Sequence, residues 1–216
     1  MATLTPDHGR SLLLVDDHAV VRIGYRRLLE QAQAGWEVEE ADSGEAACRL
    51  CAERTYSVVV LDLALPGISG LETLRRIRAR NPGQRVLVMS MHEQHAFVRQ
   101  ALEAGAMGYV TKSSAPETLT TALARVLDGH RFLGPDLAAE PSGARRADAG
   151  LDTLSPREFE IFRMLAAGRR TADIAATLNI SYKTAANCST RIRGKLAVGA
   201  PADLTRLAIR AGVMEL

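Results

Sequence analysis

Three acidic side chains stand where an apolar run of the sequence ends. Asp16 and Asp17 follow the apolar residues 12–15, and Asp62 follows the apolar residues 58–61. Carboxylates that lie together repel one another unless a cation or a proton compensates their charge. Mg2+, a hard cation with oxygen ligands, suits an open and partly hydrated site of this kind. Beside Mg2+, the carboxylate of Asp62 could accept a phosphoryl group.

A hydroxyl and an ammonium group end two later apolar runs. Ser90 ends residues 85–90, and Lys112 ends residues 106–112. The Lys112 ammonium would neutralise charge on the phosphoryl oxygens in the transition state. The Ser90 hydroxyl could hydrogen-bond one of those oxygens afterwards. Any one strand-end acid can simply cap a loop, so the prediction depends on the whole set in this order along the chain.

The segments that carry these residues alternate between strand and helix patterns. Strands are predicted at 11–17, 36–41, 56–62, 85–90 and 106–112, with helices near 19–33, 44–54, 70–80, 94–104 and 116–128. This alternation predicts an α/β doubly wound, five-stranded parallel sheet covered on both faces, with the more polar strand 36–41 at an edge. Ligands bind beyond the carboxyl ends of such strands, so the polar residues should converge on one crevice.

The chain changes character after residue 129. Residues 130–152 are rich in Gly, Pro, Ala and charge, and we interpret them as a linker with a short helix at 135–140. From residue 153 the pattern is wholly helical. Two short helices joined by a tight turn at 179–181 predict a helix-turn-helix unit. We therefore expect an α/β domain at 10–129 and a small all-α domain at 153–216.

Charge also separates the two halves. Residues 1–129 hold 14 Lys/Arg and 16 Asp/Glu, whereas residues 130–216 hold 13 Lys/Arg and 9 Asp/Glu, so the second half is the basic one.

A helix-turn-helix places its second helix in the major groove of DNA, where Asn can read adenine and Lys or Arg can contact guanine or phosphate. The candidate contacts on that helix are Lys183, Thr184, Asn187, Arg191 and Lys195. A solvated basic helix in a protein-binding domain would show the same charge pattern.

Several blocks of the sequence resemble a known family. “LLLVDDHAVVRIGYRRLLE”, “VVVLDLALPGISGLE”, “VLVMS” and “GAMGYVTKSSAPETL” are similar to the receiver domain of two-component response regulators. The stretch from “LSPRE” to “RIRGKL” (154–196) resembles the LuxR-type helix-turn-helix. This pairing is that of the NarL/FixJ class of response regulators, and it implies a flavodoxin-like fold for the receiver.

The resemblance implies a role for each acid of the crevice. Asp62 resembles the phosphoacceptor of the family. Asp16 and Asp17 resemble the metal-binding pair, and Asp62 and the backbone carbonyl of Ala64 would complete the protein ligands of Mg2+.

The resemblance also implies how the signal is passed on. Lys112 resembles the lysine that contacts the phosphoryl group. Ser90 and Tyr109 resemble the switch pair, whose hydroxyl and ring rearrange on phosphorylation.

The predicted DNA-binding helix departs from the family pattern. Many members carry Thr-Val-Lys-Asn-His where this chain has Thr184, Ala185, Ala186, Asn187 and Cys188. A branched apolar residue, a lysine and a histidine are therefore missing from the expected contact face, which alters the expected operator sequence. The helix itself is not weakened, because Ala is a good helix former.

These features together predict a phosphorylation-controlled DNA-binding transcription regulator and not an enzyme. A sensor histidine kinase would supply the phosphoryl group, and a homodimer would bind double-stranded DNA. Two alternatives remain open: a ligand-responsive or phosphorylation-independent LuxR-type regulator, and an Mg2+-dependent aspartyl-phosphate phosphatase. The first needs an apolar ligand pocket in the first half. A phosphatase of the haloacid-dehalogenase type needs an acid two residues after the nucleophile, where this chain has Ala64.

The cellular setting is predicted from composition. The chain has three cysteines, an odd number, which indicates reduced thiols and a cytoplasmic location. No apolar stretch reaches the length of a membrane-spanning helix, and the N-terminus lacks the apolar segment of a signal peptide, so we expect no membrane partner.

Overall fold

The computed structural model describes residues 10–32, 36–138 and 150–214. Within these ranges, six parallel strands form one sheet in the order β2-β1-β3-β4-β5-β6. The strands are β1 (Ser11–Val15), β2 (Glu37–Ala41), β3 (Val58–Leu61), β4 (Val86–Ser90), β5 (Gly108–Thr111) and β6 (Phe132–Leu133). β2 lies at an edge, as its polar composition predicts.

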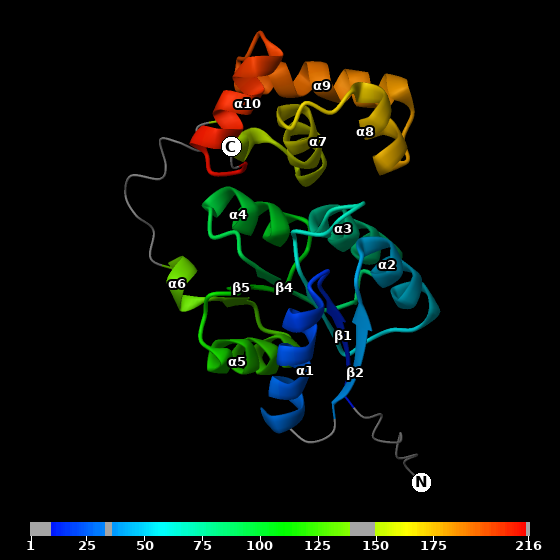
Figure 1. Ribbon diagram of the computed structural model, residues 1–216, viewed down its shortest axis with the longest axis vertical. Coiled ribbons are helices and arrows are strands. Elements are labelled where there is room, and N and C mark those ends of the chain that lie inside the picture. Colours follow the sequence, from blue (N-terminus) through cyan, green and yellow to red (C-terminus); the bar gives the residue numbers. More distant parts are fainter. Residues whose placement is uncertain (1–9, 33–35, 139–149, 215–216) are drawn as a thin grey trace.

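Helices cover both faces of this sheet (Figure 1). They are α1 (Ala19–Ala32), α2 (Gly44–Glu53), α3 (Gly70–Arg80), α4 (His95–Glu103) and α5 (Pro116–Leu127). Successive strand residues pack to opposite sides: Leu12 and Leu14 lie in one cluster with side chains of α1 and α5, and Leu13 and Val15 lie in the other with α2, α3 and α4. Because both faces are buried, the strands are apolar throughout and not alternating.

The sheet has one strand more than the sequence predicts. β6 pairs with β5, with Phe132 opposite Gly108 and Leu133 opposite Tyr109. A short helix, α6 (Pro135–Ala138), follows it. Both elements lie in the segment that we interpreted as a linker. A strand of two residues carries no periodic pattern of its own, so its pairing with β5 decides its conformation.

The last part of the chain is helical, as predicted. It contains a 3-10 turn (Leu151–Thr153), α7 (Pro156–Ala166), α8 (Thr171–Leu178), α9 (Tyr182–Leu196) and α10 (Pro201–Arg210). A capping box formed by Ser155 and Glu158 begins α7. Asn179, in the left-handed conformation, ends α8, and the Ser181 hydroxyl caps α9. These two caps produce the tight turn of the helix-turn-helix.

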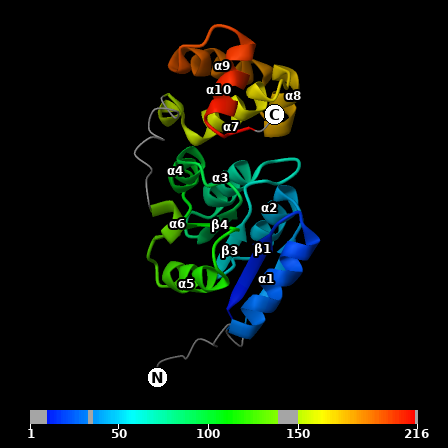
Figure 2. The ribbon, with the colours of Figure 1, turned by 60° about the vertical axis from the view of Figure 1, so that its left-hand side comes forward.

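The two domains contact each other through α7, which lies on α3 and α4 (Figures 1 and 2). Arg99 and Gln100 of α4 donate hydrogen bonds of 2.9 and 2.8 Å to the backbone carbonyls of Leu151 and Leu154. α9 lies on the far side of α7 from the sheet (Figures 1 and 2). None of the helices described is long and apolar enough to cross a lipid bilayer.

Candidate functional site

The predicted crevice forms at the carboxyl ends of the central strands. Asp16 and Asp62 are 0% and 1% exposed. The Nζ atom of Lys112 lies 2.5 Å from Oδ2 of Asp16 and 2.7 Å from Oδ2 of Asp62. β1 and β3 are neighbours, and β5 lies two strands from β3, so the sheet order brings these three side chains together.

The charge of Lys112 is stabilised by its position. Burial disfavours the ammonium form, but hydrogen bonds to Asp16 and Asp62 outweigh burial and raise the pKa of Lys112. A charged ammonium therefore compensates two carboxylates that would otherwise be buried without a counter-ion. The second oxygen of Asp62, Oδ1, accepts a hydrogen bond of 3.1 Å from the backbone N–H of Ala64.

Groups that could hold a divalent cation lie at the end of β1. One ligand atom from each of Asp16, Asp17 and His18 lies within 4.8 Å of the others. Nδ1 of His18 is 2.8 Å from Oδ1 of Asp17, which is exposed. Carboxylates from β1, with Asp62 across Lys112, fit the oxygen ligands that Mg2+ requires. The sequence prediction omitted His18, although it directly follows the two acids.

Ser90 and Tyr109 are both fully buried beside this crevice. They are joined through the backbone of His92: Ser90 Oγ accepts from the His92 N–H at 3.2 Å, and the Tyr109 hydroxyl donates to the His92 carbonyl at 2.6 Å. Burial raises the pKa of Tyr109, so the phenol stays protonated and remains a donor. The resemblance to the family paired Ser90 with Tyr109, but it did not indicate that the backbone of His92 joins them.

The second candidate surface is the solvent side of α9. Lys183, Thr184 and Asn187 are exposed there, as the helical spacing predicts. Tyr182, at the start of the helix, is 63% exposed and was not singled out by the sequence. The buried side of α9 includes Ile192, which packs in the core.

Two predicted contact residues of α9 are held by an acid of α7. Arg191 Nε and Lys195 Nζ each lie 2.6 Å from a carboxylate oxygen of Glu158. Burial would raise the pKa of Glu158, but hydrogen bonds from Lys195, from the Ser155 backbone N–H and from Arg191 lower it to about 2. The side chains of Arg191 and Lys195 are 58% and 34% exposed, so they remain accessible while also joining α9 to α7.

One expectation about the contact face is wrong. Ala185 and Cys188 are 1% and 7% exposed, and both lie on the core side of α9 with Ile192. Of the three departures from the family pattern, only Ala186 is at the surface, where it is half-buried. Helical periodicity turns the other two toward α7 and α8, so they alter packing and not the contact face.

Comparison with known families agrees with this geometry. Residues 12–124 match the model of the response regulator receiver domain, and residues 152–208 match the model of the bacterial regulatory proteins, luxR family. The chain is a response regulator. Its combination of domains confirms the resemblance to the NarL/FixJ class. The response regulator is therefore homologous to DNA-binding regulators that depend on phosphorylation, and receiver domains in general require Mg2+ for that reaction.

Curated relatives share nearly the full length of this response regulator. The transcriptional activator protein ExaE of Pseudomonas putida is 44% identical over 210 residues, which cover 95% of this chain and 98% of that protein. The response regulator UvrY of Escherichia coli K12 is 33% identical over 207 residues, which cover 94% of this chain and 95% of that protein. Neither similarity is confined to one of the two domains.

Solved structures resemble the response regulator over one domain or both. RcsB from Salmonella enterica serovar Typhimurium, solved bound to the promoter rprA with the phosphomimetic BeF3−, has a TM-score of 0.72 and 26% identity, and the alignment covers 93% of this chain and 98% of that chain. A LuxR-family response regulator from Aurantimonas sp. has 46% identity and a TM-score of 0.59 over 63% of this chain and 97% of that one.

Proposed function

We propose that this response regulator controls transcription and that a phosphoryl group on Asp62 switches it. A sensor histidine kinase would donate the group. The observation that carries the proposal is the ion pairing of Lys112 with both Asp16 and Asp62 in a buried crevice. In that position the ammonium is within reach of phosphoryl oxygens attached to Asp62 and can neutralise their charge.

The transfer would be a displacement at phosphorus. An oxygen of Asp62 forms a bond to phosphorus while the bond to the kinase histidine nitrogen breaks, and the electron pair of the broken bond stays on that nitrogen. Asp16, Asp17, Asp62 and the Ala64 carbonyl would hold Mg2+, which supplies further positive charge to the phosphoryl oxygens. The phosphoryl group stays on Asp62 of the protein itself. No separate substrate is turned over, so the protein is not an enzyme in the usual sense.

DNA is the proposed target of α9. Lys183, Thr184 and Asn187 are the candidates for contacts to bases, and Arg191 and Lys195 are the candidates for contacts to phosphate. The similarity to RcsB, which was solved on a promoter with a phosphomimetic, supports this assignment. We expect a homodimer on DNA, because paired helix-turn-helix units read inverted half-sites. The protein would act in the cytoplasm, with the receiver at 10–129 and the DNA-binding domain at 153–216.

The test combines Asp62→Asn with a matched control, Asp42→Asn. Asp42 is also an acid directly after a strand, but it follows the edge strand β2 and is exposed. Each protein is treated with Mg2+ and a small phosphodonor, and its intact mass and affinity for promoter DNA are measured together. We expect the wild type and Asp42→Asn to gain one phosphoryl group and higher DNA affinity, and Asp62→Asn to gain neither. An acid-stable, base-labile phosphoryl adduct on Asp62→Asn would refute the assignment. A modified wild type with unchanged affinity would favour a phosphorylation-independent regulator.

A further inference from the structure

The loop between β4 and α4 connects the switch pair to the DNA-binding domain. Its residue His92 is bonded at the backbone to both Ser90 and Tyr109. Its imidazole ring stacks on the ring of Phe97 in α4, with centroids 4.0 Å apart and an angle of 2° between the ring planes. One residue therefore contacts the switch pair with its backbone and the next helix with its side chain.

Phe97 also contacts the DNA-binding domain directly. Its fully buried ring meets Phe159 of α7 edge to face, with centroids 5.4 Å apart and planes at 87°. The guanidinium carbon of Arg163, one turn further along α7, lies 5.1 Å from the centroid of the Phe97 ring. The ring of Phe97 is thus held by His92 from the receiver and by Phe159 and Arg163 from the other domain.

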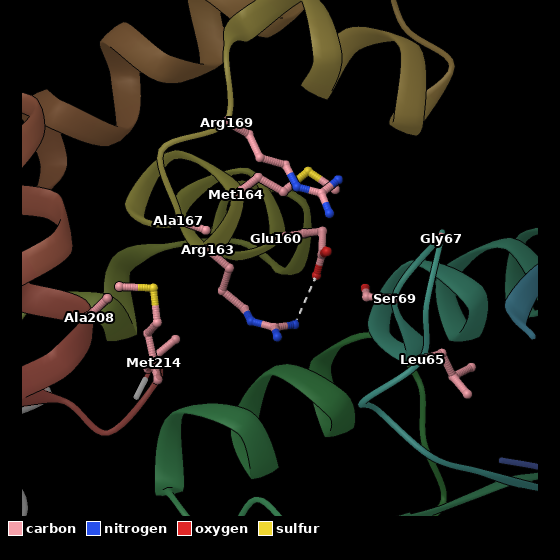
Figure 3. Close-up of a pocket in the computed structure, with 11 residues that line it drawn as sticks. Leu65, Gly67, Ser69, Glu160, Arg163, Met164, Ala167, Arg169, Ala208 and Met214 are labelled. Carbon is pink, nitrogen blue, oxygen red and sulfur yellow. Dashed lines mark ion pairs between the residues drawn. The ribbon is translucent and has the colours of Figure 1, made fainter. Parts of the chain in front are cut away.

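The surrounding interface is not packed like a permanent core. A cavity of about 180 Å3 lies between α7 and the loop before α3, with Ser69 and Glu160 in its lining (Figure 3). Two buried oxygens of the interface, Oε1 of Gln94 and Oε1 of Gln100, lack a hydrogen-bond partner among the described residues. Oε2 of Glu160 accepts no hydrogen bond there but lies 3.7 Å from Nη1 of Arg163, in a long ion pair (Figure 3). Buried polar atoms without partners oppose the packing, and the aromatic contacts of Phe97 act together with the hydrogen bonds from Arg99 and Gln100 to hold α7 in place.

We propose that His92 is a positioning residue that holds the two domains together until Asp62 is phosphorylated. Ser90 Oγ now accepts the His92 N–H. A phosphoryl oxygen on Asp62 would accept the Ser90 O–H, and the rotation that brings this hydroxyl to the phosphoryl group would carry Oγ away from the His92 N–H. When Ser90 turns to the phosphoryl oxygens, the loop loses one of its two anchors. The His92 ring then leaves Phe97, and α7 is released from α4. The release step rests on the proposed phosphorylation of Asp62, whereas the contact of His92 with Phe97 does not.

The structure suggests three variants for a test. His92→Ala removes the ring, His92→Phe keeps a ring that can stack, and Met91→Ala changes the exposed neighbour in the same loop. Hydrogen exchange is followed in α4 and α7 of the full-length, unphosphorylated protein. An aromatic contact of this kind corresponds to an about two- to ten-fold change in an equilibrium constant. We therefore expect exchange in α7 to be faster by about that factor in His92→Ala, and unchanged in His92→Phe and Met91→Ala.

The second measurement is the gain in DNA affinity at equal phosphoryl occupancy, taken from intact mass. His92→Ala should show a smaller gain than the wild type, because its domains are already released, and His92→Phe should restore the gain. The proposal would be overturned if hydrogen exchange in α7 were as slow in His92→Ala as in the wild type. It would also be overturned if exchange were faster in His92→Ala and equally fast in His92→Phe. If phosphorylation does not switch this protein, the modified wild type shows no gain in DNA affinity, yet the difference in exchange between His92→Ala and the wild type persists. The two failures are therefore distinguishable.

Discussion

The guanidinium group of Arg157, in α7, lies 2.5 Å from the carboxylate of Glu72, in α3, 85 residues earlier in the chain. Glu72 is 2% exposed and also pairs with Arg75 and Arg76 of its own helix. Burial would raise the pKa of Glu72, but hydrogen bonds from Arg75 and Arg76 and the charge of Arg157 lower it. A charged and nearly inaccessible carboxylate thus lies between the two domains.

Arg157→Gln should loosen the contact between the domains. The expected loss is about 1 kcal/mol, because Glu72 keeps two other arginines and is not left unpaired. Hydrogen exchange in α3 and α7 would measure it. Arg170→Gln is the matched control, since Arg170 is exposed and its ion pair is with Asp173 of the same domain. Equal exchange in the two variants would show that this ion pair does not stabilise the closed arrangement.

Glu158 should make the stability of the DNA-binding domain depend on pH. Its pKa is lowered from 4.5 to about 2 in the folded protein, so its contribution is complete above about pH 4.5 and is lost as the pH falls toward 2. Glu158→Gln should lower the free energy of unfolding by about 1–2 kcal/mol at neutral pH, and by less in acid. Urea unfolding along a pH series would measure both, with the exposed Glu30→Gln as control. If Glu158→Gln lowers the free energy of unfolding as much in acid as at neutral pH, the charge of Glu158 is not the cause of the loss.

Ser90→Ala should separate phosphorylation from its consequence. A phosphoryl group adds roughly −1.5 to −2 charges and strong acceptors, and it acts only through contacts that differ between the two states. Without the hydroxyl, Asp62 should still be modified, but the gain in dimerisation or DNA affinity should fall. Ser113→Ala, in an exposed loop, is the control. An unchanged gain in Ser90→Ala would mean that the signal leaves the crevice by another route.

The lifetime of the phosphoryl group should depend on residue 64. Hydrolysis of the acyl phosphate needs an oriented water molecule, and the exposed Ala64 has no polar group to position one. We expect slow self-dephosphorylation and faster loss in Ala64→Asn, measured by intact mass over time. His92, the other side chain near this water, is engaged in stacking on Phe97, so residue 64 is the sharper test. A lifetime unchanged by substitution at both positions would remove this explanation.

Alanine variants of α9 should fall into two classes in a salt titration. Arg191→Ala and Lys195→Ala should weaken binding to specific and scrambled duplexes alike and reduce the slope of log affinity against log salt by about 0.9 each. Lys183→Ala and Asn187→Ala should relax preference at one base position per half-site, by about 1–3 kcal/mol. If all four bind both duplexes as tightly as the wild type, α9 does not recognise DNA.

Much of the fold follows from local pattern, because buried parallel strands and capped helices leave clear signals. The apolar run of β3 and the tight turn at 179–181 each appear where the sequence predicts them. The exceptions depend on distant partners. β6 exists because β5 is beside it, and Arg191 faces Glu158 because α7 packs against α9. Glu158 completes the capping box of α7, and nothing in that motif indicates the two cations that its carboxylate also binds.

The position of α9 on the outer side of the closed molecule has a consequence for how promoters are found. The exposed cation Lys183 is available before any phosphoryl group arrives. Attraction of such cations to the DNA backbone is independent of sequence and allows a protein to slide and hop along the duplex. We therefore expect the unmodified protein to search chromosomal DNA already, so that activation lengthens its residence at an operator and does not begin the search.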